Sequence, residues 1–220
     1  MFSTRRITFL FPAAVALLSF GACQQSKPVS ENKEPAVAAK DLVSCTGIGE
    51  VKLTDSYQDL EKKFGKANLT EHDNNVLGKF TAIWDQKPEQ VNIYWKEKAA
   101  PYTHIDFMET VSPDAPYTTQ KGLKVGMLMV DVQKINSDMP LTFVNPYANQ
   151  DPGLITSFNN GELAIADPCL SGHVEVTKTR NIDAKVLAAF TGEKSVESTH
   201  KLIMGGRMDV IFANFRLANK

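Results

Sequence analysis

Apolar residues recur every three or four positions in two stretches of this chain, residues 51–70 and residues 123–142, which begin 72 positions apart. Each stretch opens on a short apolar run, continues at helical spacing and ends at residues that break helices. The first predicts a helix that is capped at Asp55 or Ser56 and ended by Gly65. The pattern therefore indicates a duplicated unit. The predicted apolar helix faces are Tyr57, Leu60 and Phe64 in the first copy and Leu128, Val132 and Ile135 in the second.

Three runs after the first helix alternate apolar and polar residues, over 76–84, 90–96 and 103–108. A period of two is typical of strands with one covered face, and short turns separate the runs. We therefore expect an antiparallel meander beneath the first helix. The covered face is predicted to hold Phe80, Ala82, Trp84, Val91, Ile93, Trp95, Ile105 and Phe107. The opposite, solvated face supplies the candidate binding residues Tyr94, Lys96, His104 and Asp106.

The second copy is predicted to continue through further strands and one more helix. Asn160-Gly161 favours a tight hairpin turn between two of these strands, because both central residues of such a turn adopt positive φ. The predicted strands cover 141–144, 154–159, 162–166, 173–179 and 208–215, and the helix covers 183–190.

The first residues form an export signal. Arg5 and Arg6 precede an apolar run over 7–20 that is too short to anchor the chain stably across a membrane. The sequence Phe-Gly-Ala-Cys at 20–23 resembles the lipobox of bacterial lipoproteins, which implies lipid attachment at Cys23 and a membrane anchor. Gln24 stands where an Asp retains lipoproteins at the inner membrane, so the resemblance implies the outer membrane, facing the periplasm. The alternative is an ordinary secretory cleavage site beside a cysteine.

Removal of residues 1–22 takes away two of the 24 basic side chains and none of the 25 acidic ones, which leaves a net charge of −3. This balance argues against a nucleic-acid partner. With Cys23 lipidated, Cys45 and Cys169 remain in a compartment that permits oxidation. We expect a disulfide between them, and two free buried thiols are the alternative.

These elements predict an α+β fold of two tandem modules, each with a helix on an antiparallel sheet, the sheets being continuous or paired. Residues 24–41 contain almost no large apolar side chains and cannot bury enough surface to order themselves. The predicted domains are 1–22 as signal peptide, 23–41 as flexible tether, 42–112 as first module and 113–220 as second module with a C-terminal helix and strand.

Glycine-flanked motifs at 47–53 and 122–126 each precede a predicted helix and meander. This layout resembles the tandem modules of the beta-lactamase-inhibitory-protein-like group, which includes the small outer-membrane assembly lipoproteins of the SmpA/OmlA type. The resemblance covers about residues 47–179. It implies a non-enzymatic protein that binds another protein through an exposed sheet face. Thr54-Asp55 stands where the single-module relatives usually have Gly-Met, and no binding residues carry over.

Residues that carry catalysis or bind metal are sparse in the pattern. The four histidines have no second His or Cys at metal-ligand spacing, and no nucleophile motif is present, so we expect no enzyme, no metal and no cofactor. The predicted function is therefore protein binding by a membrane-tethered module. The alternative is a small-molecule or envelope-polymer ligand in the cleft between the two modules. A hydrolase would require carboxylates, or a Ser/His pair, that only the fold brings together.

Overall fold

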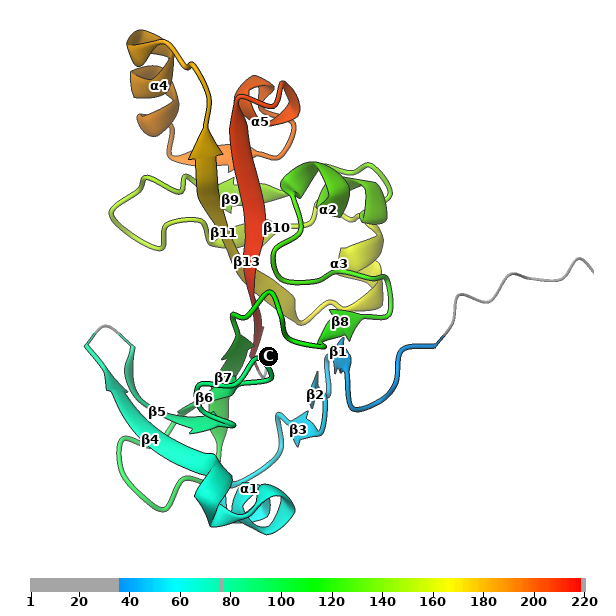
Figure 1. The fold of residues 1–220 in the computed structure, drawn as a ribbon, viewed down its shortest axis with the longest axis vertical. Helices are drawn as coiled ribbons and strands as arrows, with labels where there is room; N and C mark the ends of the chain where they lie inside the picture. The colour runs from blue at the N-terminus through cyan, green and yellow to red at the C-terminus, as the bar shows by residue number, and fades with distance from the viewer. Residues whose placement is uncertain (1–35, 76, 219–220) are drawn as a thin grey trace, which may run out of the picture. The chain divides into compact units, whose positions relative to one another are not determined.

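The computed structural model describes residues 36–75 and 77–218. Five α-helices, a 3₁₀ helix and strands in three sheets make up these residues, so the predicted α+β class is confirmed (Figure 1). Cys23 and the predicted signal peptide lie outside the described residues. The elements of the first half of the chain (residues 42–112) are β1 (Leu42–Ser44), β2 (Gly47–Ile48), β3 (Val51–Lys52), α1 (Tyr57–Phe64), η1 (Lys66–Asn68), β4 (Leu69–Asn74), β5 (Gly78–Ile83), β6 (Val91–Trp95) and β7 (Ile105–Thr110).

The second half of the chain (residues 113–218) contains the other four α-helices. Helices α1 and α2 begin 72 positions apart, which confirms a helix in each copy of the repeated stretch. The predicted helix over 183–190 and the final strand are also found, as α4 and β13. The elements of this half are β8 (Thr118–Thr119), α2 (Met129–Ile135), β9 (Thr142–Val144), β10 (Ile155–Ser157), α3 (Glu162–Ala166), β11 (Leu170–Thr179), α4 (Ala184–Thr191), β12 (Ser195–Glu197), α5 (Lys201–Met204) and β13 (Met208–Ala218).

Strand β13 joins the two halves (Figure 1). It pairs with β7 of the first half, where Phe215 lies opposite Thr110, and with β11 of the second half. The resulting six-stranded antiparallel sheet has the order β11-β13-β7-β6-β5-β4. Two smaller sheets have the orders β10-β9-β12 and β3-β2-β1-β8. A bridge between Leu154 and His173 connects the β10 region to β11.

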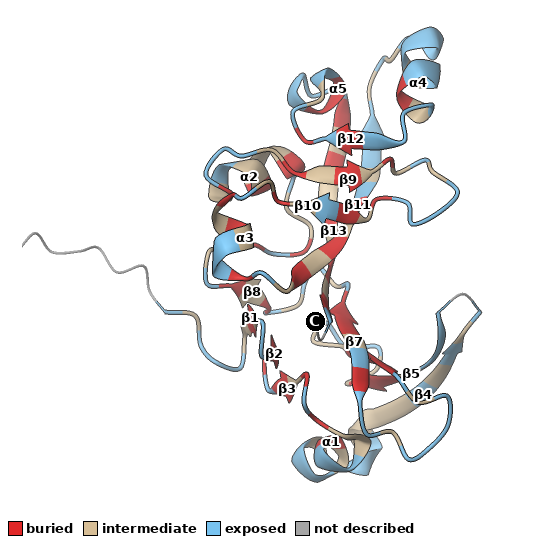
Figure 2. Ribbon diagram, turned by 180° about the vertical axis from the view of Figure 1, so that it is seen from behind, coloured by how far each residue is buried: buried red, intermediate tan, exposed pale blue. Residues whose placement is uncertain are grey.

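Both halves contribute to one core. Leu60 of α1 and Met108 of β7 are fully buried, as are Phe212 and Phe215 of β13. These side chains belong to a single cluster of buried apolar residues, called the core cluster below. Figure 2 shows the buried stretches along β7 and β13. Because β13 supplies apolar side chains to both halves, its burial couples their stability.

Helix α1 begins and ends where the sequence predicts. The Ser56 hydroxyl accepts a hydrogen bond from the Asp59 backbone N–H (3.2 Å), and the Asp59 carboxylate accepts one from the Ser56 backbone N–H (3.0 Å). This capping box satisfies two donors that the start of a helix leaves free. The hydrogen bonds from Ser56 also lower the pKa of Asp59 below its usual value. Gly65 ends the helix with φ at 80°, a conformation that favours glycine.

The predicted hairpin turn in the second half is wrong, because Glu162–Ala166 forms the helix α3 instead of a strand. Asn160 adopts positive φ, as the predicted turn requires, but the positive φ on its other side is at Asn159, and Gly161 is extended and leads into the helix. The cause is the buried side chain of Asn136, whose Oδ1 accepts a hydrogen bond from the Leu163 backbone N–H (3.1 Å). Its Nδ2 donates to two backbone carbonyl groups. A distant side chain therefore caps α3.

The predicted faces of the first-half sheet are wrong for Phe80, Ala82 and Phe107. Phe80 and Phe107 both stand directly opposite Tyr94 in the strand register, and Ala82 stands opposite Asn92. Residues that face each other across antiparallel strands lie on the same side of the sheet. These three residues therefore share the face of Tyr94 and not the face toward α1.

Two local irregularities interrupt the expected alternation. Trp84 follows β5 with φ at 55°, and its ring packs edge-on against Phe64 of α1, with ring centroids 4.9 Å apart. Phe107 of β7 lies opposite Tyr94, but a register shift places Ile105, two residues earlier, opposite the adjacent Trp95. Such a bulge sends two residues of equal parity to opposite faces of the sheet. Counting every second residue therefore fails to assign the faces at the end of β5 and at the start of β7.

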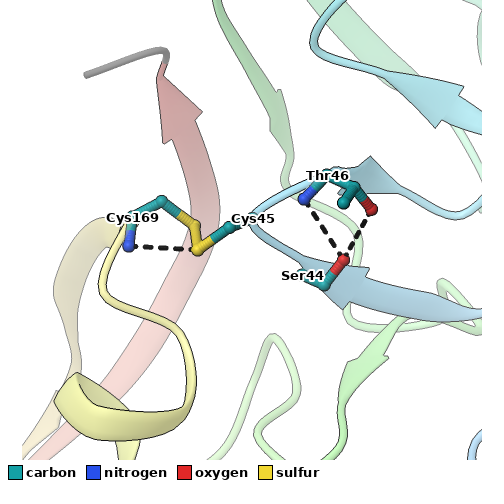
Figure 3. Close-up of a disulfide and its surroundings, with 4 residues drawn as sticks. All are labelled: Ser44, Cys45, Thr46 and Cys169. Atoms are coloured by element: carbon teal, nitrogen blue, oxygen red, sulfur yellow. Dashed lines mark hydrogen bonds between the residues drawn. A yellow bond between two sulfur atoms is a disulfide. The ribbon is translucent and has the colours of Figure 1, made fainter.

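The predicted disulfide is confirmed, and the alternative of two free thiols is wrong. Cys45, in the turn between β1 and β2, is bonded to Cys169, which precedes β11, with the Cα atoms 5.4 Å apart (Figure 3). The Cys169 backbone N–H also donates to Cys45 Sγ (3.2 Å). Ser44 and Thr46 flank Cys45 and share a hydrogen bond between their hydroxyl groups (2.9 Å). The bridge ties the first half of the chain to the second.

Candidate functional site

Four aromatic side chains form a continuous row across the first-half sheet. His72 of β4, Phe80 of β5, Tyr94 of β6 and Phe107 of β7 occupy directly opposed register positions. Their rings stack with centroids 5.1 Å apart from His72 to Phe80, 5.1 Å from Phe80 to Tyr94 and 4.3 Å from Tyr94 to Phe107. Cross-strand aromatic pairs of this kind stabilise a sheet and fix the rings in place. We call these four residues the aromatic row.

Arg216 of β13 extends the row at its Phe107 end. Its guanidinium carbon lies 4.3 Å from the centroid of the Phe107 ring, which is the geometry of a cation–π contact. The same guanidinium donates a hydrogen bond to the Glu109 carboxylate (3.1 Å). Because β13 belongs to the second half of the chain, residues from both halves build this end of the row.

A polar cluster lies beside the row. The buried carboxylate of Glu109 accepts hydrogen bonds from Arg216, from the Asn214 amide (3.2 Å) and from the Tyr94 hydroxyl (3.4 Å). Burial, followed by the nearby Glu109 charge, raises the pKa of Tyr94 to about 12. Asn214 Oδ1 in turn accepts from the His173 backbone N–H (2.7 Å). Burial and the Arg216 charge lower the pKa of His173 below its usual value.

The aromatic row is separate from the core cluster. None of its four side chains belongs to that cluster or to the half-buried apolar residues packed against it. Tyr94 is only 4% exposed, because its neighbours in the row flank it. His72, Phe80 and Phe107 stay half-buried. The row is therefore separate from the core cluster, with Tyr94 buried between half-buried rings.

The four predicted binding residues have different environments. Tyr94 lies in the aromatic row, whereas Lys96, His104 and Asp106 are exposed beside the end of β6 and the start of β7. The His104 backbone carbonyl accepts a hydrogen bond from the Lys96 backbone N–H (2.9 Å). His104 Nδ1 lies 2.6 Å from a carboxylate oxygen of Glu97, and this contact and a hydrogen bond from Thr103 lower the pKa of Glu97 to about 2. The structure thus pairs His104 with Glu97.

Sequence reasoning missed the partners of Tyr94 in the row. Phe80 and Phe107 were assigned to the covered face, and β4, which carries His72, is too polar to be predicted as a strand by its pattern. Arg216 lies 109 positions from Phe107 and reaches it only through the pairing of β13 with β7. The alternation of aromatic residues is a signal for the rings, but the register that stacks them is set by the pairing of four strands, with a bulge in β7.

The described residues contain neither a metal-ligand cluster nor a membrane-spanning helix. In the ranges 36–75 and 77–218, no group of three or more His, Cys, Asp or Glu side chains is placed to hold a metal ion. Within the same ranges, no helix has the length and apolar character that crossing a bilayer requires. Comparison of the chain with family models, with curated proteins and with solved structures finds no match.

Proposed function

We propose that this chain is a non-enzymatic protein-binding module of the bacterial cell envelope and that the aromatic row is its binding face. The observation that carries the proposal is the row itself: stacked rings on an ordered sheet, outside the core cluster, with Arg216 at one end. Aromatic residues and arginine are enriched where proteins bind one another, and they supply most interfacial hot spots.

The fixed geometry of the row favours binding. Tyr94 is held between two rings and by the hydrogen bond to Glu109, so little side-chain freedom remains to be lost when a partner docks. The charged groups of the polar cluster are already paired, since Glu109 accepts from Arg216 and Asn214. A partner therefore meets mostly ring surface, with one guanidinium that is 22% exposed.

Two observations support the finer proposal of tandem modules related to the beta-lactamase-inhibitory-protein-like group. Each half contains a helix at equivalent positions of the repeat, followed by antiparallel strands. The strands of the second half connect through the Leu154–His173 bridge to β11, and β13 connects them to the first half. We propose that the two modules share this sheet.

The proposed location follows from the cysteines. Acyl chains on Cys23 would anchor the chain to the outer membrane, on the periplasmic side. A disulfide between Cys45 and Cys169 supports an oxidising compartment, since cytosolic disulfides are rare. The alternative ligand, a small molecule or envelope polymer in a cleft between the modules, stays a prediction. A cavity of about 560 Å³ is lined by residues of the first half alone, and one of about 460 Å³ by residues of the first half together with Ala39 and Lys40.

Paired phenylalanine variants test the binding face. Phe80 lies in the aromatic row and Phe64 lies on α1, and both are half-buried rings of the same half. The lipidated, tagged protein is isolated from solubilised membranes of its native cells as wild type, Phe80→Ala and Phe64→Ala, each shown to be folded by circular dichroism. We expect a co-purifying protein that Phe80→Ala loses at least tenfold and Phe64→Ala retains. Identical sets of retained proteins in all three preparations would contradict the proposal.

A further inference from the structure

A second candidate site lies beside α1, against the opposite face of the same sheet. It is a cavity of about 560 Å³, within the range of small-molecule sites. Tyr57, at the start of α1, and Tyr102, in the loop between β6 and β7, line it together with the neighbouring Pro101. The two rings lie 6.2 Å apart, and the Tyr57 backbone N–H donates to the Tyr102 carbonyl (3.0 Å). Helix and loop are thereby held together at the cavity wall.

The wall of this cavity is anchored to the core. The Tyr102 ring stacks on Trp95 with centroids 5.5 Å apart, and Trp95 Nε1 donates to the Thr81 hydroxyl (2.9 Å). Tyr57 contacts the same Trp95 ring at 6.3 Å. Both tyrosines are therefore fixed on one side and remain half-exposed toward the cavity. Fixed tyrosine rings present the negative face of their quadrupole to a ligand.

Two carboxylates complete the lining. Glu61 comes from the middle of α1 and Glu71 comes from β4. Neither carboxylate forms an ion pair or a hydrogen bond with another residue in the described part of the chain. Both stand close enough to Tyr57 that their charges, after burial, raise the pKa of its phenol. Lys66 also lines the cavity, so the charged side chains there sum to one negative charge.

We propose that this cavity binds an organic ammonium group, with a quaternary ammonium such as choline as the preferred form. The faces of tyrosine rings attract such a cation, and the negative charges of the unpaired carboxylates attract it over a longer range. A methylated ammonium is also weakly hydrated, so it gives up little hydration free energy when it moves from water to a ring-lined wall. An anion would be repelled by the net negative lining, and a neutral ligand would leave both carboxylates without a partner. This site is distinct from the aromatic row.

The test measures choline binding to the purified full chain by isothermal titration calorimetry and by shifts of tyrosine ring resonances, at low ionic strength. The neutral isostere 3,3-dimethylbutan-1-ol is the ligand control. We expect choline to bind and the isostere to bind at least tenfold more weakly. Phosphocholine distinguishes a lipid headgroup from free choline: equal binding of both ligands indicates a headgroup source, and binding of choline alone indicates a free quaternary ammonium compound.

Charge variants on exposed residues keep the test independent of folding. Glu71→Gln is expected to weaken choline binding about three- to tenfold, and Lys66→Gln is expected to strengthen it by a similar factor. Glu175→Gln, an exposed glutamate on β11, is the matched control and leaves the affinity unchanged. Tyr102→Leu, which keeps apolar bulk but removes the ring, weakens binding about tenfold.

The proposal is overturned if choline does not bind, if the neutral isostere binds equally well, or if Glu71→Gln and Lys66→Gln change the affinity no more than Glu175→Gln does. None of these results bears on protein binding by the aromatic row. The comparison of the Phe80 and Phe64 variants does not test ligand binding in this cavity. The two proposals therefore fail separately.

Discussion

Removal of the disulfide is the perturbation whose magnitude follows most directly from the structure. Cys45 is exposed and Cys169 is half-buried, so replacing both by alanine leaves no core cavity. The cost is then mainly the entropy that the unfolded chain regains when a loop of 124 residues is opened. The chain-entropy relation gives about 5 kcal/mol for a loop of this length at 25 °C. We expect the double variant to lose about 3–5 kcal/mol of unfolding free energy.

Equilibrium unfolding in urea measures this loss. The oxidised wild type, the Cys45→Ala/Cys169→Ala variant and the wild type in reducing agent are compared at one pH and temperature. Reduction should bring the wild type onto the curve of the variant, because both lack the cross-link. The dependence of free energy on urea should also steepen without the bridge, since the opened unfolded chain exposes more surface. A loss below about 1 kcal/mol, with the bridge shown to be formed in the wild type, would refute the entropic reasoning.

Three further predictions concern single positions. Ser56→Ala removes half of the α1 capping box and should cost about 1 kcal/mol in urea unfolding, and an unchanged midpoint would count against the cap. Gly161→Ala would place a Cβ 2.3 Å from the buried Asn136 amide, so it should cost about 1–3 kcal/mol, whereas Gly192→Ala, whose nearest contact is 3.5 Å, should be nearly neutral. The pKa of Tyr94 is about 12 in the folded protein, against an ordinary value of 10.0. Tyr94 therefore contributes stability that is complete below pH 10 and is lost as the pH rises toward 12. Alkaline unfolding followed in wild type and Tyr94→Phe checks this, and parallel pH profiles of the two would contradict it.

Local signals in the sequence predicted local structure well. The Ser56 cap, the apolar spacing through Leu60 and the stop at Gly65 act within a few residues of one another, and α1 has these bounds. Helix α2 begins 72 positions later without a side-chain cap, and only its apolar spacing, through Val132, and its end at Asn136 follow the predicted pattern. The disulfide was also predictable, because the expected lipidation of Cys23 leaves only Cys45 and Cys169 to pair.

The features that the sequence did not predict depend on distant partners. Helix α3 exists where a hairpin was expected because Asn136 caps it from 27 residues away. Strand β4 has a polar sequence and is paired to β5 along its whole length, so hydrogen bonding and not apolar patterning defines it. The aromatic row needs the bulge in β7 and the register of four strands at once. Tyr94 was therefore found as a candidate, while its stacking partners and Arg216 were not.

We propose that the aromatic row contacts another protein in the cell. Photo-cross-linking in living cells tests it at the level of one residue, with p-benzoylphenylalanine at position 80 in the row and at position 64 on α1 as the matched control. We expect a discrete cross-linked protein from position 80, absent from position 64 and lost when Phe107→Ala is introduced as well. No adduct from position 80, or the same adduct from both positions, would contradict it.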